Sequence, residues 1–336
     1  MTRRTVGHAI SAFLLALTLV FSIPAHAQAP TAAPNPQAES VNEDMLFKQN
    51  SRIDGRVSIP DERSRFLIQP QGRDWRVFHE VTMPWIAGLA ILGMLLALAI
   101  FYLVFGRIKG QYSETGDRII RFRFVERFTH WMVATCFIVL ALSGLNYIYG
   151  KRLLMPIMGP YAFAEMSQWM KYAHNFFAWP FTVGILIMVV VWVRDNLPSR
   201  VDFEWIKKGG GLTGRGHVSA GRFNAGQKIV FWGVTLGSLA MFVSGLALLF
   251  PFTITGVNGM QLTSIIHGII GAVFIAGILA HIYIGSVGME GAFEAMGSGT
   301  VDREWARQHH DLWADQADRA EPIAPAAHVD PARPRI

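Results

Sequence analysis

Long uncharged stretches of apolar residues alternate with short polar segments over most of the chain. Five of these stretches reach the ~20 residues that an α-helix needs to cross the hydrocarbon core of a bilayer. They occupy residues 82–105, 127–149, 173–194, 229–250 and 264–288. The pattern predicts an all-α membrane protein, with a four-helix transmembrane bundle over 125–289 and one additional N-terminal transmembrane helix over 81–106.

The first 27 residues have the pattern of a signal peptide. A basic start at Arg3 and Arg4 precedes an apolar segment, and the sequence Ala-His-Ala at 25–27 matches a cleavage site for small residues. We therefore expect 1–27 to be removed and the next segment to lie outside the cytoplasm. Residues 28–80 begin rich in Ala, Pro and Gln and then show no helical period, which predicts a periplasmic arm that is extended and partly disordered.

Residues 290–336 follow the last span. A short amphipathic helix is expected over 302–313, ahead of an end rich in Ala and Pro that we expect to be disordered. His309 and His310 are adjacent and cannot share one helix face, so we expect them to be solvated rather than metal ligands.

Basic residues distinguish the two sides of the membrane. Residues 106–127 hold six Lys and Arg and residues 194–228 hold seven, whereas 150–172 hold three and 251–263 hold none. Lys and Arg concentrate in cytoplasmic loops. The arm is therefore expected in the periplasm and the tail in the cytoplasm, as in a multi-pass protein of a bacterial inner membrane.

The composition excludes several classes of function. Half of the residues (51%) are hydrophobic, 16% are charged, and the net charge of +6 falls mostly on the loops, so it indicates topology rather than nucleic-acid binding. Cys136 is the only cysteine. Intrachain disulfides, a covalently attached haem and a Cys-ligated iron–sulfur cluster built by this chain alone are therefore excluded. Cys136 is expected to be a small buried apolar residue, and any redox cofactor must be held by histidine.

Two histidines interrupt the fifth span, His267 and His281, fourteen positions apart. That separation corresponds to ~21 Å of helix and nearly four turns, so both rings face the same way. Gly271 and Gly277 lie one turn from each ring on the same face. Ionisable groups inside a span usually mark a function, although histidines also form ordinary hydrogen bonds between helices. We favour ligands to a flat cofactor, and haem fits best.

The topology sorts the four histidines inside spans into two pairs. His130 and His281 lie near the cytoplasmic side, and His174 and His267 near the outer side. Two b-type haems with two histidine ligands each account for this arrangement. Such haems have no open iron position, which suits electron transfer. Zinc fits poorly because no Cys, Asp or Glu lies beside the pairs to complete a tetrahedron.

A polar sequence, Asn224-Ala225-Gly226-Gln227-Lys228, begins the fourth span at the depth of the inner pair. A quinone needs hydrogen-bond donors for its carbonyl oxygens, and Asn224, Gln227 and the backbone of Gly226 could supply them. The alternative is an N-terminal helix cap at Asn224 with a snorkelling Lys228. The spacing alone does not decide between the two.

Residues 125–288, with the tail to Trp313, resemble the membrane cytochrome b (gamma) subunit of respiratory formate dehydrogenases. The resemblance rests on several short segments in the same order: Glu126-Arg127-Phe128-Thr129-His130-Trp131, Ala141-Leu142-Ser143-Gly144, His174-Asn175-Phe176-Phe177, Asn224–Lys228, Ile266-His267-Gly268, Ile278-Leu279-Ala280-His281-Ile282-Tyr283 and Trp305-Ala306-Arg307-Gln308-His309-His310.

The resemblance implies that His174 and His267 hold an outer haem and that His130 and His281 hold an inner one. It also implies that Asn224 and Gly226 border a site for menaquinone or ubiquinone. The family's partners are an iron–sulfur (beta) subunit and a molybdenum or tungsten pterin catalytic (alpha) subunit. The chain would then carry electrons from formate oxidation across the membrane to quinone. Residues 1–106 have no counterpart in the shortest family members.

Two other functions remain open at this point. Within the redox class, the chain could serve a membrane hydrogenase or a related quinone-linked oxidoreductase. Outside that class, it could be a non-redox membrane anchor or a transporter whose histidines bind protons. A reducible b-type spectrum would discriminate the redox class from the second alternative.

Overall fold

The computed structural model describes residues 70–110, 112–113, 115–211 and 218–320. The predicted signal peptide, most of the predicted arm and the end of the tail lie outside these residues. The described residues form two compact units. The first comprises 70–93, 143–171 and 244–272, and the second comprises 94–142, 172–243 and 273–320.

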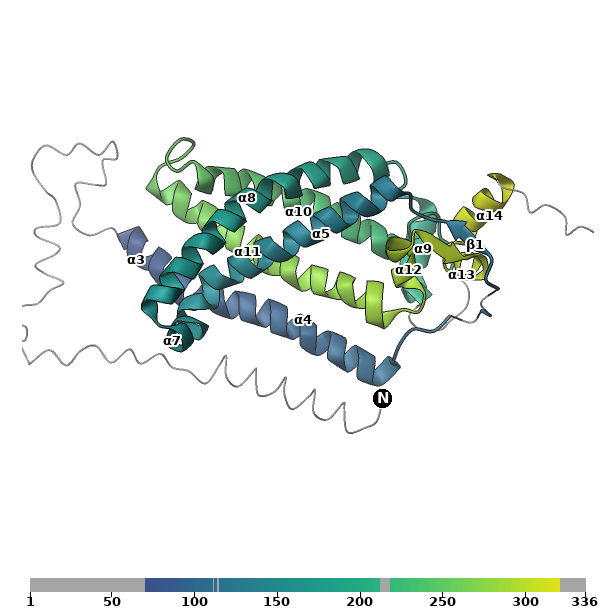
Figure 1. Cartoon of the computed structure of the whole chain (residues 1–336), viewed down its shortest axis with the longest axis horizontal. Helices are drawn as coiled ribbons and strands as arrows, with labels where there is room; N and C mark the ends of the chain where they lie inside the picture. The colour runs from purple at the N-terminus through teal and green to yellow at the C-terminus, as the bar shows by residue number, and fades with distance from the viewer. Residues whose placement is uncertain (1–69, 111, 114, 212–217, 321–336) are drawn as a thin grey trace, which may run out of the picture. The chain divides into compact units, whose positions relative to one another are not determined.

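Within the described part of the chain, five helices are long and apolar enough to cross a membrane. They are α4 (Met83–Phe105), α5 (Phe124–Leu145), α8 (Pro160–Trp192), α10 (Ala225–Leu249) and α11 (Val257–Tyr283). Each one overlaps most of a span predicted from hydropathy, so the all-α membrane architecture is confirmed (Figure 1). Single π-helical turns extend three of them: η2 (Phe78–Thr82) before α4, η3 (Asn146–Gly150) after α5 and η5 (Ile284–Gly288) after α11.

Several helices begin earlier than predicted, and α11 starts at Val257 rather than at residue 264. The end of the predicted arm is helical, because α3 (Pro70–Val77) leads through η2 directly into α4. Helix α8 begins at Pro160 rather than at residue 173. Hydropathy marks the part of a helix that lies in hydrocarbon, and a helix that continues past it in polar sequence gives no such mark.

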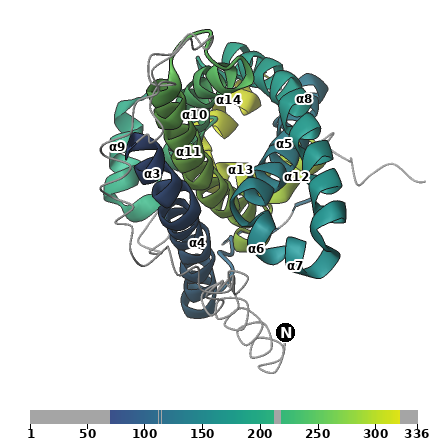
Figure 2. The same ribbon diagram turned by 90° about the vertical axis from the view of Figure 1, so that its left-hand side faces the viewer.

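In the first unit, the start of α4 packs against α11 through small residues, and the two helices are labelled next to each other in Figure 2. Ala87 is fully buried and Ala272 nearly so, and Met83 completes their cluster. The side chain of Tyr149, in η3, donates a hydrogen bond of 2.6 Å to the carbonyl oxygen of Pro84. Short helices α6 (Lys151–Leu153) and α7 (Met155–Met158) then lead toward α8. The additional N-terminal helix is therefore packed into the first unit by contacts from two other segments.

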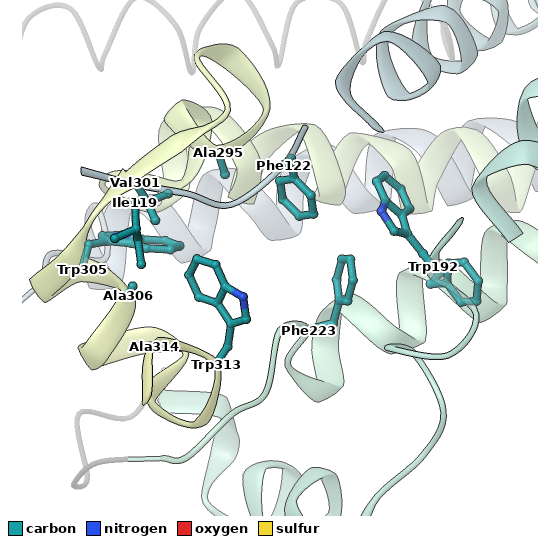
Figure 3. Packing of buried hydrophobic residues seen from close by; sticks show 11 residues of the cluster. Ile119, Phe122, Trp192, Phe223, Ala295, Val301, Trp305, Ala306, Trp313 and Ala314 are labelled. Atoms are coloured by element: carbon teal, nitrogen blue, oxygen red, sulfur yellow. The ribbon is translucent and has the colours of Figure 1, made fainter. Parts of the chain in front are cut away.

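In the second unit, a small subdomain of strands and short helices surrounds an aromatic core. Strands β1 (Arg118–Ile120) and β2 (Thr300–Asp302) pair antiparallel. Helices α12 (Ala292–Gly297), α13 (Arg303–His309) and α14 (Asp311–Ala320) follow α11. The core contains Phe122, Trp192, Phe223, Trp305 and Trp313 (Figure 3). Helix α9 (Arg200–Lys207) and the short η4 (Gly209–Gly211) also belong to this unit.

The tail is more ordered than the sequence indicated. The predicted helix over 302–313 is two helices, α13 and α14, that meet at His310. Asp302 caps α13 by accepting from the backbone N–H of Glu304 at 2.9 Å, as an N-terminal aspartate does. Gly299 joins α12 to β2 with φ +90, and its carbonyl accepts from the backbone N–H groups of Arg121 and Phe122. These contacts close the subdomain onto the segment before α5.

The prediction that His310 is solvated is wrong. His310 is 1% exposed and lies in the aromatic core of the second unit. Its Nδ1 lies 2.8 Å from the carbonyl oxygen of Gly221 and its Nε2 lies 2.9 Å from a terminal nitrogen of Arg121. An arginine nitrogen can only donate, so Nε2 accepts and Nδ1–H donates to Gly221. Cys136 is buried in an apolar cluster beside Val133, Phe181 and Ile185, as predicted.

Candidate cofactor site

The inner pair of histidines faces each other within the second unit. His130 projects from α5, six residues after Phe124, and His281 projects from α11, two residues before Tyr283. Their ring centroids lie 6.1 Å apart and their planes are inclined by 62°. An iron bound by both imidazoles, with metal–nitrogen bonds of about 2 Å as for other divalent metals, would place the two centroids about 6 Å apart. The separation therefore fits two histidines that would hold one iron between them.

One ring nitrogen of this pair is free to contact a bound group. Nδ1 of His130 is buried and has no hydrogen-bond partner among the described residues. Buried polar atoms in folded proteins are rarely left without a partner. One turn before His281, a Cβ added to Gly277 would meet no atom within 4 Å. The surface of α11 beside the ring is thus open to a flat group.

The start of α5, from which His130 projects, is fixed by a buried carboxylate. Glu126 lies one turn before His130 and is 7% exposed. It accepts from the indole N–H of Trp192 at 2.6 Å, from Arg222 at 2.7 Å and from the backbone N–H of Arg123 at 2.8 Å. This role of Glu126 has no signal in the sequence, because Trp192 and Arg222 lie far from it in the chain.

The outer histidines fall in different units. His267, on α11, belongs to the first unit, and His174, on α8, belongs to the second. Nδ1 of His267 lies 2.9 Å from Oγ of Ser244 on α10. A Cβ added to the next residue, Gly245, would lie 3.3 Å from Cε1 of the His267 ring. The pairing of His174 with His267 stays a prediction, whereas the surroundings of His267 are defined.

The polar sequence Asn224–Lys228 at the start of α10, here called the polar box, contains a reciprocal helix cap. The backbone N–H of Gln227 donates to Oδ1 of Asn224 at 2.9 Å, and the backbone N–H of Asn224 donates to Oε1 of Gln227 at 3.0 Å. This is a capping box, which satisfies two backbone donors at once. The capping alternative is therefore present in the structure. It uses the oxygens of both amide side chains, and their NH₂ groups are the hydrogen-bond donors that a quinone would require.

Lys228 and Gly226 have defined partners beside this cap. Nζ of Lys228 donates to the carbonyl oxygen of Leu197 at 3.0 Å and pairs with Asp202 of α9 at 2.9 Å. The indole of Trp205, also on α9, lies 3.1 Å from the position of a Cβ on Gly226. An aromatic ring thus packs on the backbone of the box, at a place where a side chain would crowd it. Burial alone would raise the pKa of Asp202, but its hydrogen bonds with Lys228 and Ser199 outweigh that effect and lower it.

The donor set suits a porphyrin. No group of three or more His, Cys, Asp or Glu that could hold a metal ion occurs among the described residues. A porphyrin supplies the equatorial ligands of its own iron, so the protein contributes only axial side chains. Two facing imidazoles, one of them with an unsatisfied ring nitrogen, are a suitable pair for that role.

Comparisons with known proteins agree with this chemistry. The family model for prokaryotic cytochrome b561 matches residues 121–299, which is more than half of the chain and contains the two predicted histidine pairs and the polar box. Helix α4 and everything before it lie outside the match.

The curated relatives of this chain include cytochrome subunits of formate dehydrogenases. The chain is 29% identical over 208 residues to the nitrate-inducible formate dehydrogenase cytochrome b556(Fdn) subunit of Escherichia coli K12, covering 60% of this chain and 93% of that protein. It is 30% identical over 201 residues to the formate dehydrogenase cytochrome b556(fdo) subunit of the same strain, covering 59% and 92%. The formate dehydrogenase cytochrome b556 subunit of Haemophilus influenzae is 27% identical over 205 residues, covering 58% and 82%. The chain therefore belongs to the prokaryotic cytochrome b561 family, as a cytochrome b subunit of the formate dehydrogenase type.

Proposed function

We propose that this chain is a di-haem cytochrome b subunit that carries electrons from a partner iron–sulfur subunit across a bacterial inner membrane to quinone. The observation that carries the proposal is the 6.1 Å separation between the rings of His130 and His281. His130 and His281 would hold the inner b-type haem through their ring nitrogens, and His174 and His267 the outer one. When bound, haem with two histidine ligands supplies one-electron redox chemistry without an open position for oxygen.

The chain's own residues have three tasks in this proposal. The histidines hold two irons at different depths of one bundle. Helices α5, α8, α10 and α11, each long and apolar enough to cross a membrane, would keep water away from that path. The amide NH₂ groups of Asn224 and Gln227 would donate to the carbonyl oxygens of menaquinone or ubiquinone, while the capping bonds hold both side chains in place.

The orientation follows from the distribution of basic residues and sets the energetics. With the loops 106–127 and 194–228 in the cytoplasm, the inner pair and the polar box lie on the cytoplasmic side and the arm lies in the periplasm. Each electron that moves inward then works against the membrane potential, at ~2.3 kcal/mol per 100 mV for a full crossing. Electron transfer to quinone would thus be coupled to that potential.

The partners of this chain follow from what it lacks chemically. It has one cysteine, so it cannot ligate an iron–sulfur cluster alone. Its curated relatives are named as subunits of formate dehydrogenases. We therefore assign formate oxidation to a molybdenum or tungsten pterin catalytic subunit, with an iron–sulfur subunit between that centre and the outer haem. Co-purification of the tagged chain with such subunits tests the assignment, and capture of hydrogenase subunits instead would redirect it.

Haem content tests the central claim. The purified complex should contain two haems per chain and show a b-type spectrum on reduction by dithionite. His130→Ala and His281→Ala should each lose the same one of the two haem signals, because the two rings share one iron. His79→Ala is the control, because His79 lies on η2 outside the matched region and should keep both signals. A purified complex with no reducible b-type signal would rule out the proposal.

A further inference from the structure

A serine on the neighbouring helix contacts the outer histidine. Ser244 of α10 is 6% exposed, and its Oγ lies 2.9 Å from Nδ1 of His267 on α11. Both residues belong to the first unit. A hydroxyl has one donor and two acceptor positions, so Oγ of Ser244 can accept a hydrogen bond from Nδ1–H of the ring, or donate one to Nδ1 in the other tautomer. When Nδ1–H is the donor, Nε2 carries the lone pair that a metal ligand needs.

The next residue of α10 fixes the distance between the ring and the helix. A Cβ on Gly245 would lie 3.3 Å from Cε1 of His267 and 3.9 Å from Nδ1. The imidazole therefore packs against the backbone of α10 at a point where that helix has no side chain. Two consecutive residues thus determine the ring's position, Ser244 through a hydrogen bond and Gly245 through the absence of a Cβ.

A hydrogen bond to the ring nitrogen that does not bind the metal orients a metal-ligating histidine. A ligating histidine nearly always donates its second ring N–H to an oxygen, which fixes the ring and raises its basicity. A more basic imidazole stabilises the ferric state relative to the ferrous state. The expected consequence is a lower reduction potential for the iron that His267 binds.

We propose that Ser244 is the positioning residue of the outer haem: its hydroxyl holds His267 in the tautomer and orientation that ligate the iron, and it lowers the reduction potential of that haem. This inference rests on the proposed function, because it assumes that His267 is an axial ligand. It assigns to Ser244 a role separate from that of the ligands themselves.

Three variants of the full complex test the proposal. Ser244→Ala removes the hydroxyl, and Ser244→Thr restores one at the same position. Ser238→Ala is the matched control, because Ser238 lies on the same helix, is also 6% exposed, and its Oγ has no hydrogen-bond partner among the described residues. Haem content and a spectroscopic redox titration of both haems are measured for each variant.

In Ser244→Ala we expect the midpoint potential of one haem to rise, with the other unchanged. Loss of a hydrogen-bond partner of a metal-ligating histidine changes metal affinity by about tenfold or more. A tenfold change in affinity for the ferric state alone changes the reduction equilibrium tenfold, which is about 59 mV for a one-electron couple. Ser244→Thr should return the potential toward that of the parent complex, and Ser238→Ala should leave both potentials unchanged. Selective loss of one haem in Ser244→Ala, with retention in Ser244→Thr, would also support the proposal.

Other results would overturn it. If Ser244→Ala keeps both haems at unchanged potentials, Ser244 does not position the ligand, although the di-haem proposal stands. If Ser244→Ala and Ser244→Thr lose a haem alike, or if Ser238→Ala shifts a potential as much as Ser244→Ala, the serine acts through packing of α10 and the proposal fails. If the parent complex has no haem, the proposed function itself fails. That result is read from the parent complex alone and is therefore distinct from a failure of the role of Ser244.

Discussion

Arg121 donates to Nε2 of His310 at 2.9 Å inside the core of the second unit, and both side chains are almost fully buried. The guanidinium also lies 4.9 Å from the ring of Trp313 and 5.5 Å from that of Trp305. Burial, and then the neighbouring charge of Arg222, lower the pKa of Arg121 to about 9, so Arg121 keeps its charge at neutral pH. This buried cation joins α13 and α14 to the segment that precedes α5.

The first prediction concerns the pH dependence of this contact. Burial, and then the charge of Arg121, hold the pKa of His310 well below its ordinary value. The folded state therefore binds fewer protons than the unfolded state, and stability falls as pH falls below about 6.5, the ordinary pKa of histidine. Each pH unit below that value should cost the subdomain up to about 1.4 kcal/mol. Hydrogen exchange of α13 and α14 at pH 7.5 and 5.5, corrected for intrinsic rates, measures the loss.

His310→Gln is the control for this pH effect. Glutamine offers an oxygen to Arg121 and an N–H to Gly221, as His310 does, but it does not titrate in this range. The variant should show little difference between the two pH values in the exchange of α13 and α14. An equal acid loss in the parent chain and in His310→Gln would assign the effect to another group.

The second prediction concerns Glu126. Glu126→Ala leaves the indole N–H of Trp192 without its acceptor, whereas the half-buried guanidinium of Arg222 loses one carboxylate and keeps Asp195. A buried donor left without its acceptor costs about 1–3 kcal/mol, and the start of α5 should loosen. The thermal unfolding midpoint should fall, and the haem signal that depends on His130 should fall more than the other signal. Glu126→Gln keeps one acceptor oxygen and should lose less on both measures, so equal losses in the two variants would contradict this account.

The sequence predicted the helices but not the contacts that fix the site. Each span was predicted because an uncharged stretch of sufficient length has one stable form in a bilayer. Strands β1 and β2 were missed because each has three residues and they pair across a separation of more than 170 positions. Burial of His310 was missed for the same reason, since Arg121 and Gly221 are far from it in the chain.

The same limit applies to the candidate site. Topology from basic residues paired His130 with His281, and the structure brings these two rings together. The contact between Ser244 and His267 gave no signal in sequence, because it depends on how α10 packs against α11. At the polar box, by contrast, the sequence did give a signal. The spacing of Asn224 and Gln227 allows both a helix cap and a quinone site, and the structure contains the cap. The NH₂ groups of both side chains are not used by the cap.

The third prediction concerns the packing of α4 in the first unit. Ala87 is fully buried against Ala272, so Ala87→Leu overfills the contact. Overpacking of this kind costs about 1–3 kcal/mol, and the thermal unfolding midpoint should fall. Gly93→Leu, on the same helix, is the control, because a Cβ at Gly93 would meet no atom within 4 Å. A larger loss in Gly93→Leu than in Ala87→Leu would contradict the packing of α4 through Ala87.

The last prediction separates the two roles of the polar box. Asn224→Asp and Gln227→Glu keep the oxygens that cap α10, because aspartate and glutamate also serve in capping boxes. Each variant removes an NH₂ group and with it a hydrogen-bond donor for a quinone carbonyl. We therefore expect nearly unchanged thermal stability and unchanged reduction of both haems by dithionite, but slower transfer of electrons from the reduced haems to quinone.

Asn224→Ala provides the contrast, since it removes the cap as well and should cost a further ~1 kcal/mol of stability. The measurements are thermal unfolding and the rate at which added quinone reoxidises the reduced haems. A structural cap alone predicts that only Asn224→Ala has an effect, because only that variant removes an acceptor. Normal reoxidation in both Asn224→Asp and Gln227→Glu would therefore assign these residues to helix capping and place the quinone elsewhere on the chain.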